Sequence, residues 1–231
     1  MNVLLRHGFR LLLVCAAAGI VVPGVHANTL VHFDTNLGNF DVELHESSMP
    51  ITVANFLVYV NSQRYDSTII HRSTVYNPSD IQIVQGGGYL LSGSSVLAVA
   101  TDPPIILESG TFTNVRGTIA MARGSAPDSA TSQYFFNLQN NPALDGNYAV
   151  FGNVVDSAGL AFLDAIGGVP VYDASVQLGP AFSELPLTNP SLAPSSLVVI
   201  NSVAVVPEPA TTLPAAIGLA AALAWRRKRS S

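Results

Sequence analysis

The histidines, glycines and cysteine of the chain are the first residues whose types and spacing could support chemistry. After residue 27 the histidines are His32, His45 and His71, and none has the HExxH spacing of a zinc protease. The run Gly86–Gly88 lacks the Lys and the Ser or Thr of a phosphate-binding loop, and there is no Gly-x-Ser-x-Gly nucleophile motif. The single cysteine, Cys15, permits no intramolecular disulfide and no Cys-containing metal site in the mature chain. Hydrolase, nucleotide and metal chemistry are therefore disfavoured, and we predict no metal and no cofactor.

The arginines are the more informative residues. Between residues 28 and 205 there are fourteen acidic residues, no lysine and only four basic residues, Arg64, Arg72, Arg116 and Arg123. This acidic balance argues against nucleic acid as a partner, because phosphates require clustered Lys and Arg. It also means that each central arginine needs a specific reason to be present. Charged residues make up only 11% of the chain, which favours membrane-active segments or a nearly neutral secreted domain.

Five short segments carry a recognisable pattern of residues: Ile70-His71-Arg72, Gln85-Gly86-Gly87-Gly88, the stretch GTIAMAR at 117–123, the stretch SQYFF at 132–136, and the stretch from Leu144 to Gly152. In this order and at these separations they resemble the cyclophilin family of peptidyl-prolyl cis/trans isomerases. The segments at 51–56 and 127–132 are also similar to bacterial cyclophilins. The resemblance covers roughly residues 29–166 and the final strand, and five motifs in register argue against chance.

The resemblance implies a mainly β fold, a closed eight-stranded antiparallel barrel capped by two α-helices. It implies that Arg72 is the catalytic arginine and that Gln85 contacts the substrate beside it. The other residues that it assigns to substrate binding are His71, Ile83, Met121, Ala122, Arg123, Phe135, Leu144 and Tyr148. Among these, Ala122 and Arg123 match the strand that hydrogen-bonds the peptide, and Tyr148 matches a position that is often histidine. The expected partners are Pro-containing segments of exported proteins.

Each of these residues also has a plainer structural interpretation. Arg72 could be a surface arginine that pairs with an acid, and Arg123 could pair with Asp128 or with another acid. The remaining residues could serve packing alone: Gln85 at a strand end, Phe135 and Leu144 in the core, and His71 as a structural neighbour of Arg72.

Three positions depart from the family pattern. Residues 73–80 form an inserted loop between Arg72 and Gln85, Gln82 stands where the family places a pocket phenylalanine, and Ala143 replaces a large aromatic residue. The change at Ala143 implies altered sensitivity to cyclosporin-type inhibitors. The first two changes leave alternatives open: a non-catalytic module that binds Pro-containing peptides of the cell surface or matrix, or a surface β-protein whose site is vestigial.

The elements that must position these residues follow from periodicity and turn signals. Alternating apolar residues predict two strands over residues 29–45 around a turn at 36–39. The run Ser47-Ser48-Met49-Pro50 predicts the capped start of a helix that extends to Ser62. Farther along we expect strands at 118–122, 133–138 and 149–155, a helix at 158–166 that stops at Gly167, a proline-rich loop at 168–196 and a last strand at 197–205.

The N-terminal end of the chain predicts export. Residues 1–27 have a basic start, an apolar run and small residues at Val25 and Ala27, which is typical of a signal peptide cleaved before Asn28 by signal peptidase. The alternative is an uncleaved anchor helix. The folded domain is then expected over residues 28–205.

The C-terminal end, residues 206–231, has three parts in order: Val206-Pro207-Glu208-Pro209, an apolar run from Ala210 to Trp225, and a basic tail from Arg226 to Arg229. They resemble the PEP-CTERM sorting signal. The resemblance implies a short membrane helix, a cytoplasmic basic tail and processing by an exosortase-like enzyme. The expected product is transiently anchored and then reaches the cell surface, the extracellular matrix or the medium. The alternative is a permanent membrane anchor.

Overall fold

The computed structural model describes residues 28–75, 80–110 and 112–207. Its strands are β1 (Leu30–Thr35), β2 (Gly38–Leu44), β3 (Thr68–Ile69), β4 (Arg72–Ser73), β5 (Ile83–Gly86), β6 (Tyr89–Ser92), β7 (Ser95–Ala98), β8 (Thr118–Met121), β9 (Tyr134–Asn137), β10 (Val150–Val154), β11 (Val171–Tyr172), β12 (Leu185–Pro186) and β13 (Val199–Val205). The α-helices are α1 (Pro50–Asn61), α2 (Ser157–Gly167) and α3 (Ser175–Leu178), and short 3-10 helices lie at Pro142–Leu144, Pro180–Phe182 and Pro194–Ser196.

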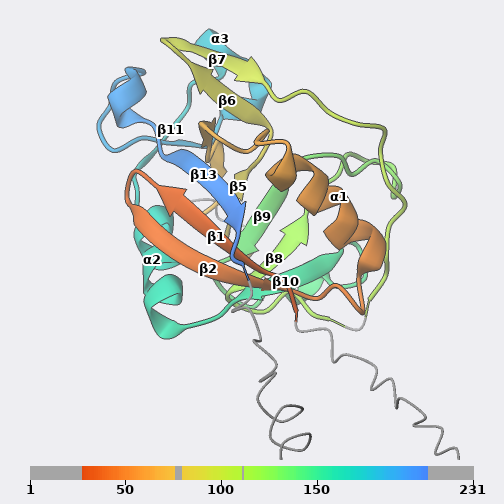
Figure 1. Cartoon of the computed structure of the whole chain (residues 1–231). Helices are drawn as coiled ribbons and strands as arrows, with labels where there is room; N and C mark the ends of the chain where they lie inside the picture. Colours follow the sequence, from red (N-terminus) through yellow and green to blue (C-terminus); the bar gives the residue numbers. More distant parts are fainter. Residues whose placement is uncertain (1–27, 76–79, 111, 208–231) are drawn as a thin grey trace, which may run out of the picture.

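One curled antiparallel sheet dominates the structure (Figure 1). Its strand order is β4-β5-β9-β8-β10-β2-β1-β13-β3-β6-β7. Strands β3 and β4 belong to one bent segment, in which the N–H of Ile70 donates to the carbonyl of Val198 and the N–H of His71 donates to that of Gln85. The predicted mainly β, antiparallel architecture is confirmed. Within the described residues the sheet has eleven strands where eight were predicted, because this segment counts as two strands and the hairpin β6–β7 extends the sheet beyond β3. Closure of the barrel stays a prediction.

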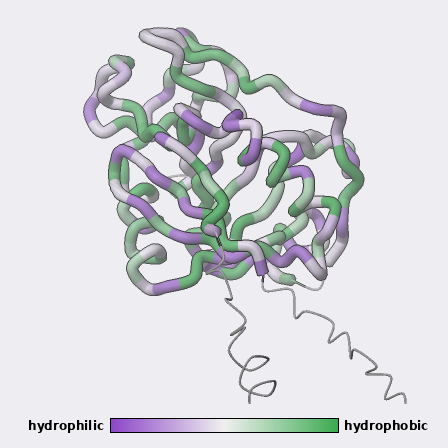
Figure 2. The backbone as a smooth tube through the Cα atoms, viewed as in Figure 1, coloured by the Kyte–Doolittle hydropathy of each residue, from purple (hydrophilic) through white to green (hydrophobic). Residues whose placement is uncertain are grey.

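The β1–β2 hairpin shows why the strand predictions succeed. Phe40, Val42 and Leu44 are buried, whereas Asp41 and Glu43 are partly exposed, as the period of two requires. Hydrophobic and hydrophilic residues accordingly alternate along these strands (Figure 2). The other predicted strands correspond to β8, β9, β10 and β13, each within two residues of its expected ends.

The start of α1 differs from its prediction. The N-cap residue is Met49 rather than a serine, and no side chain of its own segment caps it. The Glu108 carboxylate instead accepts hydrogen bonds from the N–H groups of Ile51 and Thr52, at 3.0 and 2.6 Å. A carboxylate at this end also interacts favourably with the helix dipole. The cap is therefore supplied by a residue that lies 57 positions after Ile51 and 56 positions after Thr52.

Helix α2 follows its prediction more closely. Asp156 caps it by accepting a hydrogen bond from the N–H of Gly159 at 2.6 Å, and the helix ends at Gly167 with Gly168 as its C-cap. The stop lies one residue later than expected.

The core lies between the sheet and its two longer helices. Phe33 of β1 is completely buried, and its ring lies 6.3 Å from that of Phe56 on α1 and 5.5 Å from that of Phe136 on β9. Phe40 stacks on Phe33 at 5.0 Å and also meets Phe162 of α2 at 5.7 Å. Both helices are thus fixed by the same aromatic cluster.

The prediction of a long loop at 168–196 is wrong. This part, which we call the accessory segment (residues 168–198), contains β11, α3 and β12 and has its own buried cluster of Ala174, Phe182, Leu185, Leu187 and Leu197 packed on Ile69 of β3. Elements of only two to four residues leave little periodicity in a sequence. Their order comes from burial against the sheet, which only the folded chain provides.

Both ends of the described part lie together, since the N–H of Val206 donates to the carbonyl of Leu30 at 2.8 Å. The predictions for residues 1–27 and 208–231 fall outside the described residues. Among the described helices, none has the length and apolar character that a membrane span requires.

Candidate active site

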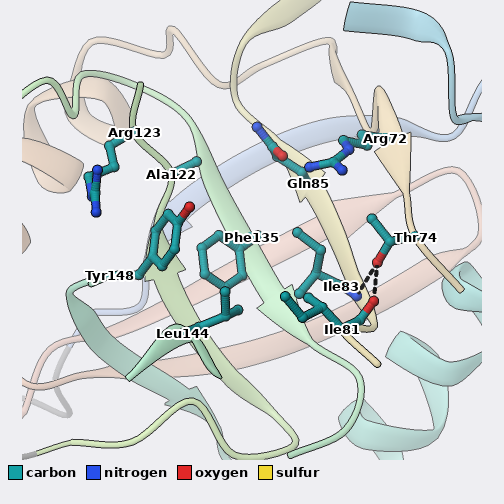
Figure 3. A pocket seen from close by; sticks show the side chains of 10 residues that line it. All are labelled: Arg72, Thr74, Ile81, Ile83, Gln85, Ala122, Arg123, Phe135, Leu144 and Tyr148. Carbon is teal, nitrogen blue, oxygen red and sulfur yellow. Dashed lines mark hydrogen bonds between the residues drawn. The ribbon is translucent and has the colours of Figure 1, made fainter. Parts of the chain in front are cut away.

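A pocket of about 340 Å³ opens on the outer face of the sheet (Figure 3). Its lining residues are Arg72, Thr74, Ile81, Ile83, Gln85, Ala122, Arg123, Phe135, Leu144 and Tyr148. Eight of these ten belong to the set that the sequence predicts. The structure therefore brings together residues from five distant segments of the chain.

Strand pairing sets the central residues of the pocket side by side. Arg72 on β4 lies opposite Gln85 on β5, and Gln85 lies opposite Phe135 on β9. Because side chains alternate across a sheet, the neighbouring Val84 and Phe136 point to the core instead. A shift of one residue in either register would turn the site residues to the wrong face.

The floor of the pocket is apolar and buried. Ile83, Ala122, Phe135 and Leu144 belong to one buried cluster and are between 2% and 9% exposed. Tyr148 meets Phe135 edge-on, with ring centroids 5.4 Å apart. Leu144 reaches the floor from the 3-10 helix Pro142–Leu144. Such a floor suits a small apolar ring.

The polar groups stand at the rim. Nε of Arg72 donates to Oε2 of Glu184 at 2.7 Å, and the Gln85 amide donates to the Gln133 side-chain oxygen at 2.8 Å. The guanidinium of Arg72 lies beside the Gln85 side chain in Figure 3. Arg72 thus both pairs with an acid and lines the pocket, so its two interpretations are compatible.

Arg123 stands at the opposite side of the pocket. Its Nε donates to the carbonyl of Asn147 at 2.7 Å, and Nη1 donates to the carbonyl of Gly124 at 3.0 Å. Its guanidinium lies 5.0 Å from the ring centre of Tyr148. Asp128, the suggested partner, accepts a hydrogen bond from the N–H of Leu107. These contacts hold Arg123 by backbone carbonyls and an aromatic face.

Thr74 and Ile81 are the pocket residues that the sequence reasoning missed. Oγ1 of Thr74 donates to the carbonyl of Ile81 at 2.8 Å and accepts from the N–H of Ile83 at 2.9 Å, which joins Thr74 to the segment that leads into β5. Ile81, Ile83 and Gln85 share one face by simple alternation, and that signal was available. The pocket lining includes Ile81 and not Gln82, so an aliphatic residue stands next to the position where the family pattern has phenylalanine.

His71 and Met121 lie behind the pocket rather than in it. Met121 is 2% exposed and belongs to the main core. His71 is also 2% exposed, and its ring lies 5.0 Å from that of Tyr89 and 6.3 Å from that of Phe182. These positions agree with structural support of the site.

The burial of His71 predicts a pH-dependent stability. Burial, and secondarily the charge of Arg72, lowers the pKa of His71 to about 4. The unfolded chain, with an ordinary pKa near 6.5, binds more protons between these values, so stability falls as the pH falls from 6.5 towards 4. We expect a slope of up to about 1.4 kcal/mol per pH unit in urea unfolding. His71→Gln should flatten this slope, and an equal slope in both proteins would contradict the assignment.

Comparison with known proteins gives the family. Residues 30–181 match the model of the family described as cyclophilin type peptidyl-prolyl cis-trans isomerase/CLD. Residues 205–229 match the PEP-CTERM protein-sorting motif. The three-dimensional fold is similar to that of a cyclophilin type peptidyl-prolyl cis-trans isomerase from Cryptosporidium parvum, solved in the presence of the dipeptide ala-pro. That likeness has a TM-score of 0.55 at 24% identity and covers 78% of this chain and 99% of that chain.

Bacterial proteins are similar in sequence. A peptidyl-prolyl cis-trans isomerase of Acinetobacter baylyi is 43% identical over 62% of this chain and 74% of its own length. Peptidyl-prolyl cis-trans isomerase A of Dickeya dadantii is 41% identical over 64% of this chain and 76% of its own length. Isomerase B of Escherichia coli is 38% identical over 61% of this chain and 85% of its own length. With the family match over 30–181 and a pocket built from the same motifs, this chain belongs to the cyclophilin type peptidyl-prolyl cis-trans isomerase family and ends in a PEP-CTERM sorting motif.

Proposed function

We propose that this protein is an exported isomerase that catalyses cis/trans rotation about X–Pro bonds in secreted or surface proteins, with Arg72 and Gln85 as its catalytic residues. The observation that carries the proposal is the pairing of Arg72 with Gln85 at the rim of a buried apolar floor. The family membership and the isomerase names of its relatives support the same activity.

The reaction is a rotation about an amide bond, and a well-placed hydrogen-bond donor can accelerate it. Rotation about an X–Pro bond breaks amide conjugation, with a barrier of about 18–20 kcal/mol and uncatalysed times of tens of seconds. In the twisted transition state the proline nitrogen becomes pyramidal and accepts a hydrogen bond better than in either planar state. A guanidinium held beside that nitrogen stabilises the transition state more than the ground state, as catalysis requires.

The remaining pocket residues must add to the transition-state stabilisation that one hydrogen bond provides. A single charge-assisted bond contributes only about 1.5–3 kcal/mol, so fixed contacts in a water-poor site must add to it. Ile83, Phe135 and Leu144 would receive the proline ring, and Gln85 would contact the carbonyl that precedes it. Ala122, Arg123 and Tyr148 would hold the peptide on the far side, while His71 and Met121 support the floor from behind.

The closed eight-stranded barrel is part of the proposal. Ile70 bonds to Val198, which directly precedes β13, and His71 bonds to Gln85 of β5. These bonds support closure, because one short segment then connects the neighbourhoods of β13 and β5, which lie far apart in the sheet order.

A proline-isomerisation assay tests the function. The full chain, purified in detergent, is added to a tetrapeptide with a central X–Pro bond, and the exchange rate between its cis and trans forms is followed by NMR. We expect catalysed exchange. Measurable binding of Pro-containing peptides without any acceleration would instead favour the non-catalytic binding module.

Export is the second part of the proposal. We infer that signal peptidase removes residues 1–27 and that an exosortase-like enzyme acts near the Pro-Glu-Pro motif after transient anchoring by residues 210–225. The folded domain of residues 28–205 would then reach the cell surface, the matrix or the medium. The sorting-motif match supports this route.

Mass spectrometry of the protein released from the cells checks the processing. We expect a chain that begins at Asn28 and has lost the segment from Ala210 onward. A released chain that still ends at Ser231 would contradict the sorting proposal, and one that keeps Met1 would contradict the signal peptide.

A further inference from the structure

Glu184 of the accessory segment contacts the candidate active site, where its carboxylate accepts a hydrogen bond from Arg72. Glu184 follows the part of the chain that matches the family model, which ends at residue 181. It stands between the 3-10 helix Pro180–Phe182 and strand β12. It lies in none of the family motifs and is not among the site residues predicted from them.

The backbone of Glu184 is fixed by its neighbours. Phe182 is 3% exposed and Leu185 is completely buried, and both pack in the cluster that includes Ile69 of β3. The ring of Phe182 lies 4.6 Å from that of Tyr89. Because close-packed side chains leave few alternative positions, the carboxylate of Glu184 has a rigid base.

Two bonds connect Glu184 to β4. The N–H of Ser73 donates to the main-chain carbonyl of Glu184 at 2.8 Å, and Nε of Arg72 donates to its Oε2 at 2.7 Å. The side chains are 41% exposed for Arg72 and 21% exposed for Glu184. A partly exposed pair of this kind contributes little to stability. The main consequence of this ion pair is therefore the orientation that it gives to the Arg72 side chain.

The geometry points to Glu184 as the positioning residue of Arg72, an inference that rests on the proposed isomerase function. A carboxylate bound at Nε restricts the last torsions of the arginine and leaves its terminal nitrogens for the pocket, where the guanidinium lies beside Gln85 (Figure 3). A donor that is already oriented pays no reorganisation cost when the transition state forms. The accessory segment thereby becomes part of the catalytic apparatus.

Kinetics of substitutions at Glu184 test the inference. A misplacement of about 1 Å can reduce a rate by ~10², and we expect Glu184→Ala to lower kcat about tenfold with little change in KM, because the floor remains intact. Glu184→Gln keeps an oxygen acceptor and should lose less. In an Arg72→Ala background, Glu184→Ala should cause no further loss. Asp164→Ala removes the matched exposed pair with Arg116, away from this pocket, and should change nothing.

An NMR signal separates positioning from general damage. The Nε–H resonance of Arg72 should be sharp and slowly exchanging in the wild type and should lose this protection in Glu184→Ala. Unfolding midpoints equal to that of the wild type would show that Glu184→Ala and Glu184→Gln both fold. If Glu184→Ala does not fold, the same kinetic and NMR measurements are made on Glu184→Gln.

The outcomes are distinguishable. The inference is overturned if kcat is unchanged or increased in Glu184→Ala while Arg72→Ala lowers it. It is also overturned if Glu184→Ala lowers kcat by the same factor in the Arg72→Ala background as in the wild type. An inactive wild type would refute the proposed function. In that case the Arg72 Nε–H signal still decides whether Glu184 positions the guanidinium, and its persistence in Glu184→Ala would refute the positioning.

Discussion

Arg72→Ala is expected to lower kcat/KM for an X–Pro tetrapeptide by ~10²–10³, the usual effect of losing one oriented donor at a reacting centre. Arg72 lines the pocket opposite Gln85, and its interaction with the proline nitrogen is realised mainly in the twisted transition state. The loss should therefore appear in kcat, whereas the affinity for a ground-state peptide should change far less. Exchange NMR gives the rate, and titration calorimetry gives the affinity.

Phe135→Ala is the matched comparison, because it removes the floor and keeps the guanidinium. Phe135 is 2% exposed in the cluster beneath the pocket, so its truncation should weaken peptide binding and raise KM. If Arg72→Ala weakened binding as much as it slowed exchange, Arg72 would serve peptide binding and not catalysis.

Phe33→Ala is expected to lower the free energy of unfolding by about 3–5 kcal/mol, the usual cost of truncating a fully buried phenylalanine. The Phe33 ring contacts aromatic rings on β2, α1 and β9, namely Phe40, Phe56, Tyr134 and Phe136. A cavity at this point would loosen the helix and both strands together. Urea unfolding with a constant m-value measures the change.

Val176→Ala on α3 provides the control for this experiment. Val176 is 91% exposed, and its truncation should change the free energy of unfolding by no more than about 0.5 kcal/mol. A loss below 1 kcal/mol for Phe33→Ala would show that the aromatic cluster is not the centre of stability.

Much of the fold was predictable because its signals are local. The alternation of Phe40, Val42 and Leu44 marks a strand with one buried face, and the structure buries these three residues. Asp156 and the glycines at 167 and 168 mark the ends of a helix. In each case the physical cause, a side-chain period or a cap, lies within a few residues of its effect.

The candidate site was predictable for a different reason. Its residues lie in short motifs whose order and separation match a family, and the pocket brings eight of the ten together. Whether Arg72 and Gln85 carry catalysis remains the prediction that the kinetic experiments test. Ile81 was missed because a match anchored on Gln85 places Gln82 at the pocket, whereas strand alternation places Ile81 on the same face as Ile83 and Gln85.

The family, the strand faces, the two longer helices and the sorting motif could be predicted from the amino-acid sequence alone, because each depends on short runs of neighbouring residues. The capping of α1 by Glu108, the packing of the accessory segment and the contact of Glu184 with Arg72 instead depend on how distant parts of the chain meet in the fold. The contacts of Glu108 and Glu184 join residues 56 and 112 positions apart, respectively. Such pairs leave no mark in local periodicity, because they depend on which surfaces meet when the chain buries its apolar side chains.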